Sequence, residues 1–122
     1  VCSSDLVVTQ YQVAGGATVY AEGSWLLAGG FNMSYTVMCE RATIDFDSAR
    51  GAEALQLTEE GQPARTIKPD GVDGYVGELS HLLAAIQSGQ PPTVVTAQDG
   101  LSAVEICEAE EKSIQTGSVV RL

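Results

Sequence analysis

Apolar and polar residues alternate along much of the first half of the chain. The clearest run covers residues 31–40, and residues 42–47 continue it. Side chains on the two faces of a β-strand repeat with a period of two, so both runs predict strands with one buried and one more polar face. The positions assigned to the buried face are Phe31, Met33, Tyr35, Val37, Cys39, Ala42, Ile44 and Phe46.

Further strands are predicted from β-branched and aromatic residues, or from segments that lie between turns. They cover residues 7–13, 17–27, 53–58 and 64–68. Gly15 and Gly16 favour a tight turn between the first two, since glycine readily takes positive φ. Short connections between successive strands imply a largely antiparallel sheet in meander order.

The last third of the chain changes to a helical period. Residues 73–88 place apolar side chains every three or four positions, which makes one apolar stripe. Asp70 and Asp73 are candidate N-caps of this helix, and Gly89 before two prolines ends it. The stripe consists of Val76, Leu79, Leu83 and Ile86, widened by Leu82.

A second helix is predicted over residues 97–115. Thr96 and Asp99 resemble a capping box at its start, and Gly117 ends it. Its apolar stripe consists of Leu101, Val104, Cys107 and Ile114. Residues 118–122 are predicted as a final short strand.

These elements predict an α+β fold: a mostly antiparallel open sheet of about six to seven strands, with the two C-terminal helices packed on one face. Two helices are too few to cover both faces of such a sheet. The expected core consists of Phe31, Tyr35, Val37, Ile44, Leu79, Leu83, Ile86, Val104 and Cys107.

Composition narrows the function classes. The chain has 122 residues, which allows one domain with a modest core, and its net charge is −10. So acidic a chain argues against nucleic-acid binding, which needs a basic surface. No apolar run reaches the roughly 20 residues that span a membrane, and no signal peptide is evident. A cytoplasmic protein is the expectation.

Two features bear on redox state and domain limits. Cys2, Cys39 and Cys107 show no metal-ligand spacing, and an odd count argues against a disulfide framework, so reduced thiols are expected, buried at Cys39 and Cys107. Residues 1–6 look like a translated sequencing adapter and are set aside from the fold. Residues 7–122 are then expected to be one C-terminal domain of a truncated protein, with a genuine strand start as the alternative for residues 1–6.

Catalytic motifs are not evident in the sequence. The doublets Gly15-Gly16 and Gly29-Gly30 do not form a phosphate-binding GxGxxG turn. Lys68 and the single histidine, His81, are more readily assigned to a strand end and a helix flank than to proton transfer. The acidic residues near Glu108 look like a solvated helix face. No catalytic, cofactor-binding or metal-ligating residue is therefore assigned.

The order of residues in the last third resembles the C-terminal part of the glucose–fructose oxidoreductase / inositol dehydrogenase (Gfo/Idh/MocA) family. That family ends with an aromatic and a Glu-Leu pair, an apolar helix, Gly-x-x-Pro, an Asp-led helix, a glycine and a strand. The matching residues here are Tyr75, Glu78, Leu79, Ile86, Gly89, Pro92, Asp99, Ala109, Ser113, Gly117 and Val120. Residues 19–25 (VYAEGSW) add to the likeness.

The resemblance implies a dihydrodipicolinate-reductase-like domain that binds substrate and forms oligomers. The intact parent would be an NAD- or NADP-dependent dehydrogenase of a sugar or cyclitol, with its cofactor-binding Rossmann domain outside this chain. Trp25 and Tyr75 could then border the sugar, although we favour a core position for Trp25. The more polar sheet face either faces solvent or packs against a sister subunit, as it does in the family. The residues of this face are Thr18, Tyr20, Glu22, Ser24, Asn32, Ser34 and Thr36, together with Gln10 and Gln12.

A second class of function remains open on the sequence alone. The chain could be a non-catalytic α+β module that binds a ligand or a partner through its sheet. In either case, the chain by itself is expected to lack dehydrogenase activity and to bind no cofactor.

Overall fold

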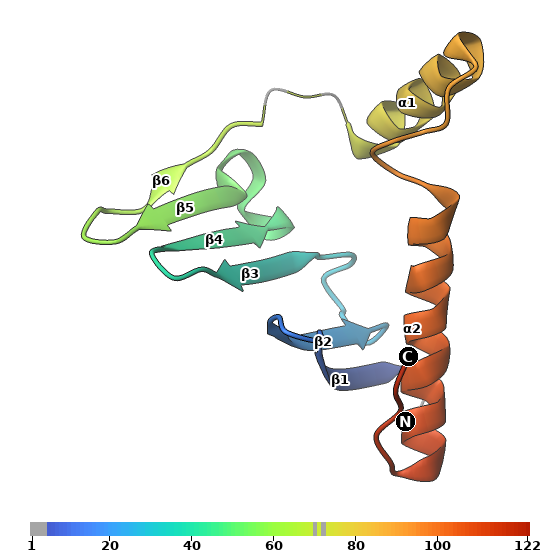
Figure 1. Cartoon of the computed structure of the whole chain (residues 1–122). Helices are drawn as coiled ribbons and strands as arrows, with labels where there is room; N and C mark the ends of the chain where they lie inside the picture. Colours follow the sequence, from blue (N-terminus) through green and yellow to red (C-terminus); the bar gives the residue numbers. More distant parts are fainter. Residues whose placement is uncertain (1–4, 70, 72) are drawn as a thin grey trace. The chain divides into compact units, whose positions relative to one another are not determined.

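The computed structural model describes residues 5–69, 71 and 73–122. The chain divides into two compact units, residues 1–70 and 71–122. The first unit contains six antiparallel strands in two open sheets, and the second contains two helices (Figure 1). The predicted α+β class is confirmed. Residues 1–4 of the predicted adapter segment and the candidate cap Asp70 lie outside the described residues.

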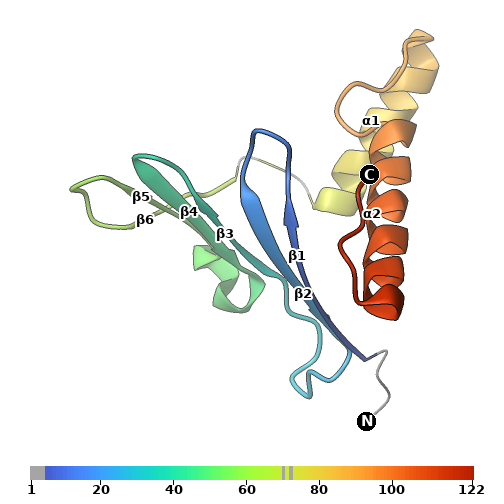
Figure 2. The same ribbon diagram turned by 60° about the horizontal axis from the view of Figure 1, so that its bottom comes forward.

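The first sheet is a hairpin of β1 (Leu6–Gln12) and β2 (Thr18–Ser24). Figure 2 shows the two strands side by side over their full length. Leu6 lies opposite Ser24 at one end, and Gln12 lies opposite Thr18 at the other. Gly15 has a φ of +68°, a conformation that glycine adopts with no Cβ penalty. The predicted turn is confirmed, although β2 stops three residues before the predicted end at Leu27.

The second sheet has four strands in chain order. They are β3 (Ser34–Met38), β4 (Ala42–Asp47), β5 (Leu55–Glu59) and β6 (Arg65–Thr66). Two rows of opposed apolar residues cross its face, Tyr35–Phe46–Leu55 and Val37–Ile44–Leu57. The rings of Tyr35 and Phe46 stack with centroids 5.0 Å apart, an arrangement that stabilises neighbouring strands. The predicted alternation over β3 and β4 therefore gives one apolar face.

A 3-10 helix, η1 (Ser48–Glu53), joins β4 to β5 and was not predicted. Asp47 caps it, because its Oδ1 accepts a hydrogen bond from the Ala49 N–H at 2.9 Å. Gly51 breaks the helix with a φ of 57°. So short a segment has no hydrophobic period, and the Asp47-Ser48 pair was its only sequence signal.

The helical unit follows its predicted ends closely. Asp73 accepts a hydrogen bond from the Tyr75 N–H at 3.0 Å and starts α1 (Gly74–Ser88). Thr96 and Asp99 form the predicted capping box of α2 (Ala97–Thr116). Gly89 and Gly117 end the two helices in the left-handed region, as glycine commonly does after a helix.

Two expectations about the sheet are wrong. The strands form two sheets, because β2 and β3 are not hydrogen-bonded neighbours. Residues 118–122 follow α2 without forming a strand. Both errors have one cause, since β-propensity favours an extended backbone but a strand exists only where another backbone pairs with it.

The predicted core is also wrong for each unit taken alone: none of the residues that the structure describes is buried. Ile44 is half-buried, and the other predicted core residues are exposed, as are the thiols of Cys39 and Cys107. The physical reason is that a core needs two packed layers. Within the described residues, the first unit has sheets with no helix beyond η1, and the second has helices with no sheet.

Candidate functional site

The polar residues predicted as an interface lie on two different sheets. Thr18, Tyr20, Glu22 and Ser24 alternate along β2, whereas Ser34 and Thr36 lie on β3 and Asn32 just precedes it. The structure therefore does not join them in one hydrogen-bonded sheet. Their role in association stays a prediction.

Hydrogen-bond register shows what the β2 residues have in common. Trp25 donates to the carbonyl of Asp5, and Val13 donates to that of Ala17, so odd-numbered residues bond across the hairpin. In an antiparallel pair the residues between these turn their N–H and C=O groups the other way. The outward-turned residues of β2 are Thr18, Tyr20, Glu22 and Ser24.

The same reasoning applies to β3. Ser48 donates to the Met33 carbonyl, and Cys39 donates to the Ala42 carbonyl, so odd-numbered residues bond to β4. Ser34, Thr36 and Met38 then turn their backbone groups to the open edge. The predicted interface residues on β2 and β3 thus lie along two strand edges, a property that side-chain polarity alone did not indicate.

Asp45, in the centre of β4, contacts two polar side chains of the first unit. Its Oδ1 accepts a hydrogen bond from Thr36 Oγ1 at 2.8 Å, and its Oδ2 pairs with Arg50 of η1. The Thr36 hydroxyl first, and the Arg50 guanidinium second, hold the pKa of Asp45 below its ordinary value. This pair was not predicted because it joins β4 to η1, and η1 has no signal of its own in the hydrophobic pattern.

A second polar network anchors the start of β3. Ser48 Oγ contacts Asn32 Oδ1, and it accepts a hydrogen bond from the Met33 N–H at 2.9 Å. Asn32 and Thr36 are therefore engaged within the first unit. These contacts fix η1 against β3, which is a structural role for two of the predicted interface residues.

The two aromatic residues predicted near a sugar belong to different units. Trp25 is 89% exposed and Tyr75 is 80% exposed. The core position favoured for Trp25 is wrong, because nothing in the first unit packs over this side chain, as none of the described residues is buried. Trp25 instead begins a segment with other exposed apolar side chains, namely Leu26, Leu27, Phe31 and Met33.

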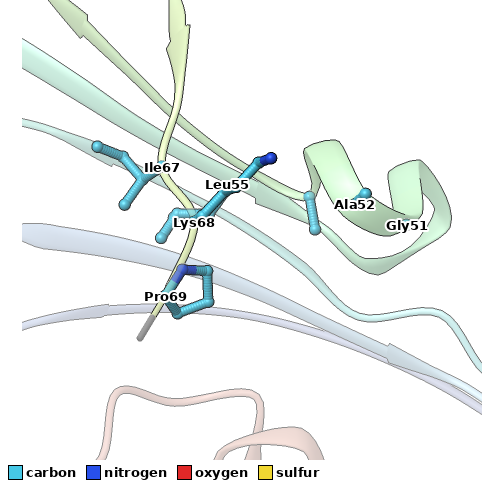
Figure 3. Close-up of a pocket in the computed structure, with 7 residues that line it drawn as sticks. Gly51, Ala52, Leu55, Ile67, Lys68 and Pro69 are labelled. Carbon is cyan, nitrogen blue, oxygen red and sulfur yellow. The ribbon is translucent and has the colours of Figure 1, made fainter. Parts of the chain in front are cut away.

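A shallow, mostly apolar pocket of about 420 Å³ lies between η1 and the end of the first unit (Figure 3). Leu55, Ile67 and Pro69 supply much of its apolar lining, and Lys68 is the one charged side chain among the described lining residues. General acid–base catalysis needs a second polar group within hydrogen-bond reach of such a lysine, and the described lining does not supply one.

His81 has a structural role in the second unit. Its Nε2 accepts hydrogen bonds from the N–H groups of Thr93 at 3.3 Å and Val94 at 3.4 Å. The imidazole on α1 therefore holds the connection that leads to α2. The position of His81 on α1 agrees with the predicted helix flank.

The described residues contain no group of three or more His, Cys, Asp or Glu side chains placed to hold a metal ion. No helix in that part of the chain is long and apolar enough to cross a membrane. Comparison with known protein families, with curated proteins and with solved structures found no match.

Proposed function

We propose that this chain is the C-terminal, substrate-binding and oligomerisation part of an NAD(P)-dependent oxidoreductase that acts on a sugar or cyclitol. The helical unit carries the proposal. Asp73, Gly89, Asp99 and Gly117 start or end its helices, and the last three are among the residues on which the family resemblance rests. A cytoplasmic location belongs to the same proposal.

The proposed domain packs α1 and α2 on the apolar face of the four-stranded sheet. Both surfaces are apolar and incompletely covered: Val37 of the sheet and Leu83 of α1 are 47% and 57% exposed. Burying apolar surface stabilises a fold by about 25 cal/mol per Å². In the proposed domain, the apolar faces of the sheet and of the helices therefore pack against each other. The resulting two-layer domain is dihydrodipicolinate-reductase-like.

The chain's own contribution to catalysis would be substrate binding. Trp25 and Tyr75 offer exposed rings that can stack on the apolar face of a pyranose or cyclitol ring. The cofactor would accept or donate the hydride. Neither helix starts directly after a strand at a glycine-rich turn, so the described residues do not fit a pyrophosphate. Another part of the parent would hold the cofactor and supply the proton-transfer groups.

A second candidate is a non-catalytic module that binds a partner. The exposed apolar segment 25–33 favours it, because Trp25 and Phe31 are 89% and 91% exposed. Contiguous exposed apolar residues commonly mark interaction sites. This candidate requires no second domain with a nucleotide site.

The upstream reading frame distinguishes the two candidates. The oxidoreductase proposal expects a strand–GxGxxG–helix unit, then Glu-Lys-Pro and a later Asp-x-x-x-His. A genuine start codon directly before this segment, with a stop codon upstream in frame, would favour the module and contradict the enzyme.

Steady-state kinetics of the complete enzyme test the substrate residues. Trp25→Ala and Tyr75→Ala should each raise the KM for the sugar by about tenfold, equivalent to about 1.4 kcal/mol, which is within the range for a stacked ring. Tyr20→Ala removes a similarly exposed ring from a strand edge and should leave KM unchanged. Equal effects of all three substitutions would contradict the assignment.

A further inference from the structure

The connection between α1 and α2, residues 89–96, runs back along one face of α1 (Figure 1). The half-buried residues of α1 are Gly77, His81 and Ala85. They are four positions apart, so they share this face. Pro92 and Thr96 are the half-buried residues of the connection. His81, between two small residues, is therefore the bulky side chain of α1 against which the connection packs.

Backbone hydrogen bonds fix the two ends of the connection to the helix termini. At its start, the Gln90 N–H donates to the Ala85 carbonyl at 3.2 Å. At its end, the Thr96 N–H donates to Asp99 Oδ2 at 2.8 Å. The two prolines that follow Gln90 have no N–H to contribute. The middle of the connection thus depends on the residues that follow these prolines.

The middle of the connection is held by the imidazole of His81. The N–H groups of Thr93 and Val94 both donate to its Nε2. Only a neutral ring with its proton on Nδ1 has a lone pair on Nε2 to accept them. A protonated imidazole donates from both nitrogens, so protonation would bring three donors together at one point.

We propose that His81 is a pH-sensitive tie, which holds the connection to α1 when neutral and releases it when protonated. Histidine changes its charge between about pH 5 and 8. The two hydrogen bonds need the neutral ring, so their contribution to stability is complete above this range and disappears as pH falls through it. This tie requires only the helical unit, so it is independent of the proposed function.

The charged groups of the surrounding elements are compatible with such a tie. Glu78 lies three residues before His81 on α1, a spacing at which a carboxylate attracts an imidazolium. Residues 89–96 contain no charged side chain. The first charged residue of α2 is Asp99, and the Thr96 hydroxyl holds its pKa below the ordinary value. The capping box therefore persists at pH 5, and release affects the connection while α2 keeps its start.

Amide hydrogen exchange of the whole chain, followed by NMR, tests the proposal. Between about pH 7.5 and about pH 5, the protection of the Thr93 and Val94 amides should fall by about tenfold after correction for intrinsic rates. The Gly117 amide is an internal control, because it donates to the Ser113 carbonyl, which does not titrate. Its protection should stay the same.

Two substitutions separate titration from simple loss of packing. His81→Gln supplies an amide oxygen that accepts but does not titrate, so Thr93 and Val94 should stay protected at both pH values. His81→Leu has no acceptor and should lose that protection at both. Circular dichroism checks that each variant keeps its helices.

Three results would overturn the proposal. The first is equal protection of the wild-type Thr93 and Val94 amides at both pH values. The second is a loss of protection in His81→Gln as large as that of the wild type on acidification. The third is a proton on Nε2 of His81 near pH 7.5, read from the nitrogen chemical shifts of the ring.

Discussion

The two units are ordered by different kinds of interaction. The ends of α1 and α2 are set by contacts within a few residues, such as Asp73 to Tyr75 and Thr96 to Asp99. The four-stranded sheet depends on residues far apart in the chain, such as Asn32 and Ser48. Contacts within a few residues set where a helix begins and ends, but they do not build a core. The stability of the helical unit should therefore depend more on the surface against which its apolar side chains pack than on its caps.

The largest expected effect tests whether the two units cover each other. Ile44 lies at the centre of the sheet's apolar face. If the helices cover this face, Ile44→Asp should lower the free energy of unfolding by about 3 kcal/mol or more, because it buries an unpaired carboxylate. Chemical denaturation followed by circular dichroism measures the loss.

Thr43→Asp is the matched control, since it adds the same charge one residue away on the opposite face. It should cost less than about 1 kcal/mol. Equal, small losses from both substitutions would show that the apolar face stays open to solvent.

A smaller effect is expected where the helical unit depends on one glycine. Gly89 ends α1 with a φ of 65°, which a β-branched residue adopts only with strain. Gly89→Val should therefore cost about 2 kcal/mol, measured by thermal unfolding of the helical signal. Gly29→Val, where an added Cβ meets no atom within 4 Å, should cost little; equal costs would contradict the C-cap assignment.

The capping box should contribute less. Thr96 accepts a hydrogen bond from the Asp99 N–H at 3.2 Å, and Thr96→Ala should destabilise α2 by about 1 kcal/mol. Amide hydrogen exchange in the first turn of α2 would show the loss. Thr93→Ala, three residues earlier, should leave that exchange unchanged.

The smallest effect is a pH dependence in the sheet unit. The hydrogen bond from Thr36, and then the contact with Arg50, lower the pKa of Asp45 from 3.8. The ionised carboxylate is thus favoured in the folded state, so its contribution to stability is complete above pH 3.8 and disappears as pH falls through the lowered pKa. Carboxyl chemical shifts followed by NMR should show Asp45 titrating below that value.

Asp45→Asn should remove this acid dependence from the sheet unit. Asp99, whose pKa the Thr96 hydroxyl lowers in the same direction, should keep its effect on the helical unit. A titration of Asp45 at or above its ordinary value would show that the contact with Thr36 does not form in solution.

The same comparison explains which features could be predicted. Helix ends follow from a residue and its neighbours, so Asp73, Thr96, Gly89 and Gly117 were placed correctly. The alternation of β3 and β4 predicted one apolar face. The Asp45–Arg50 pair and the separation of β2 from β3 depend on which backbones meet, and single-residue propensities do not contain that information.

Nicotinamide binding tests the proposed function most directly. NADH would be titrated, with fluorescence as the readout, against this chain alone and against the complete protein that contains it. The proposal predicts saturable binding by the complete protein and none by the chain alone, because the described helices have no pyrophosphate-binding start. Saturable micromolar binding by the chain alone, or no binding by the complete protein, would contradict it.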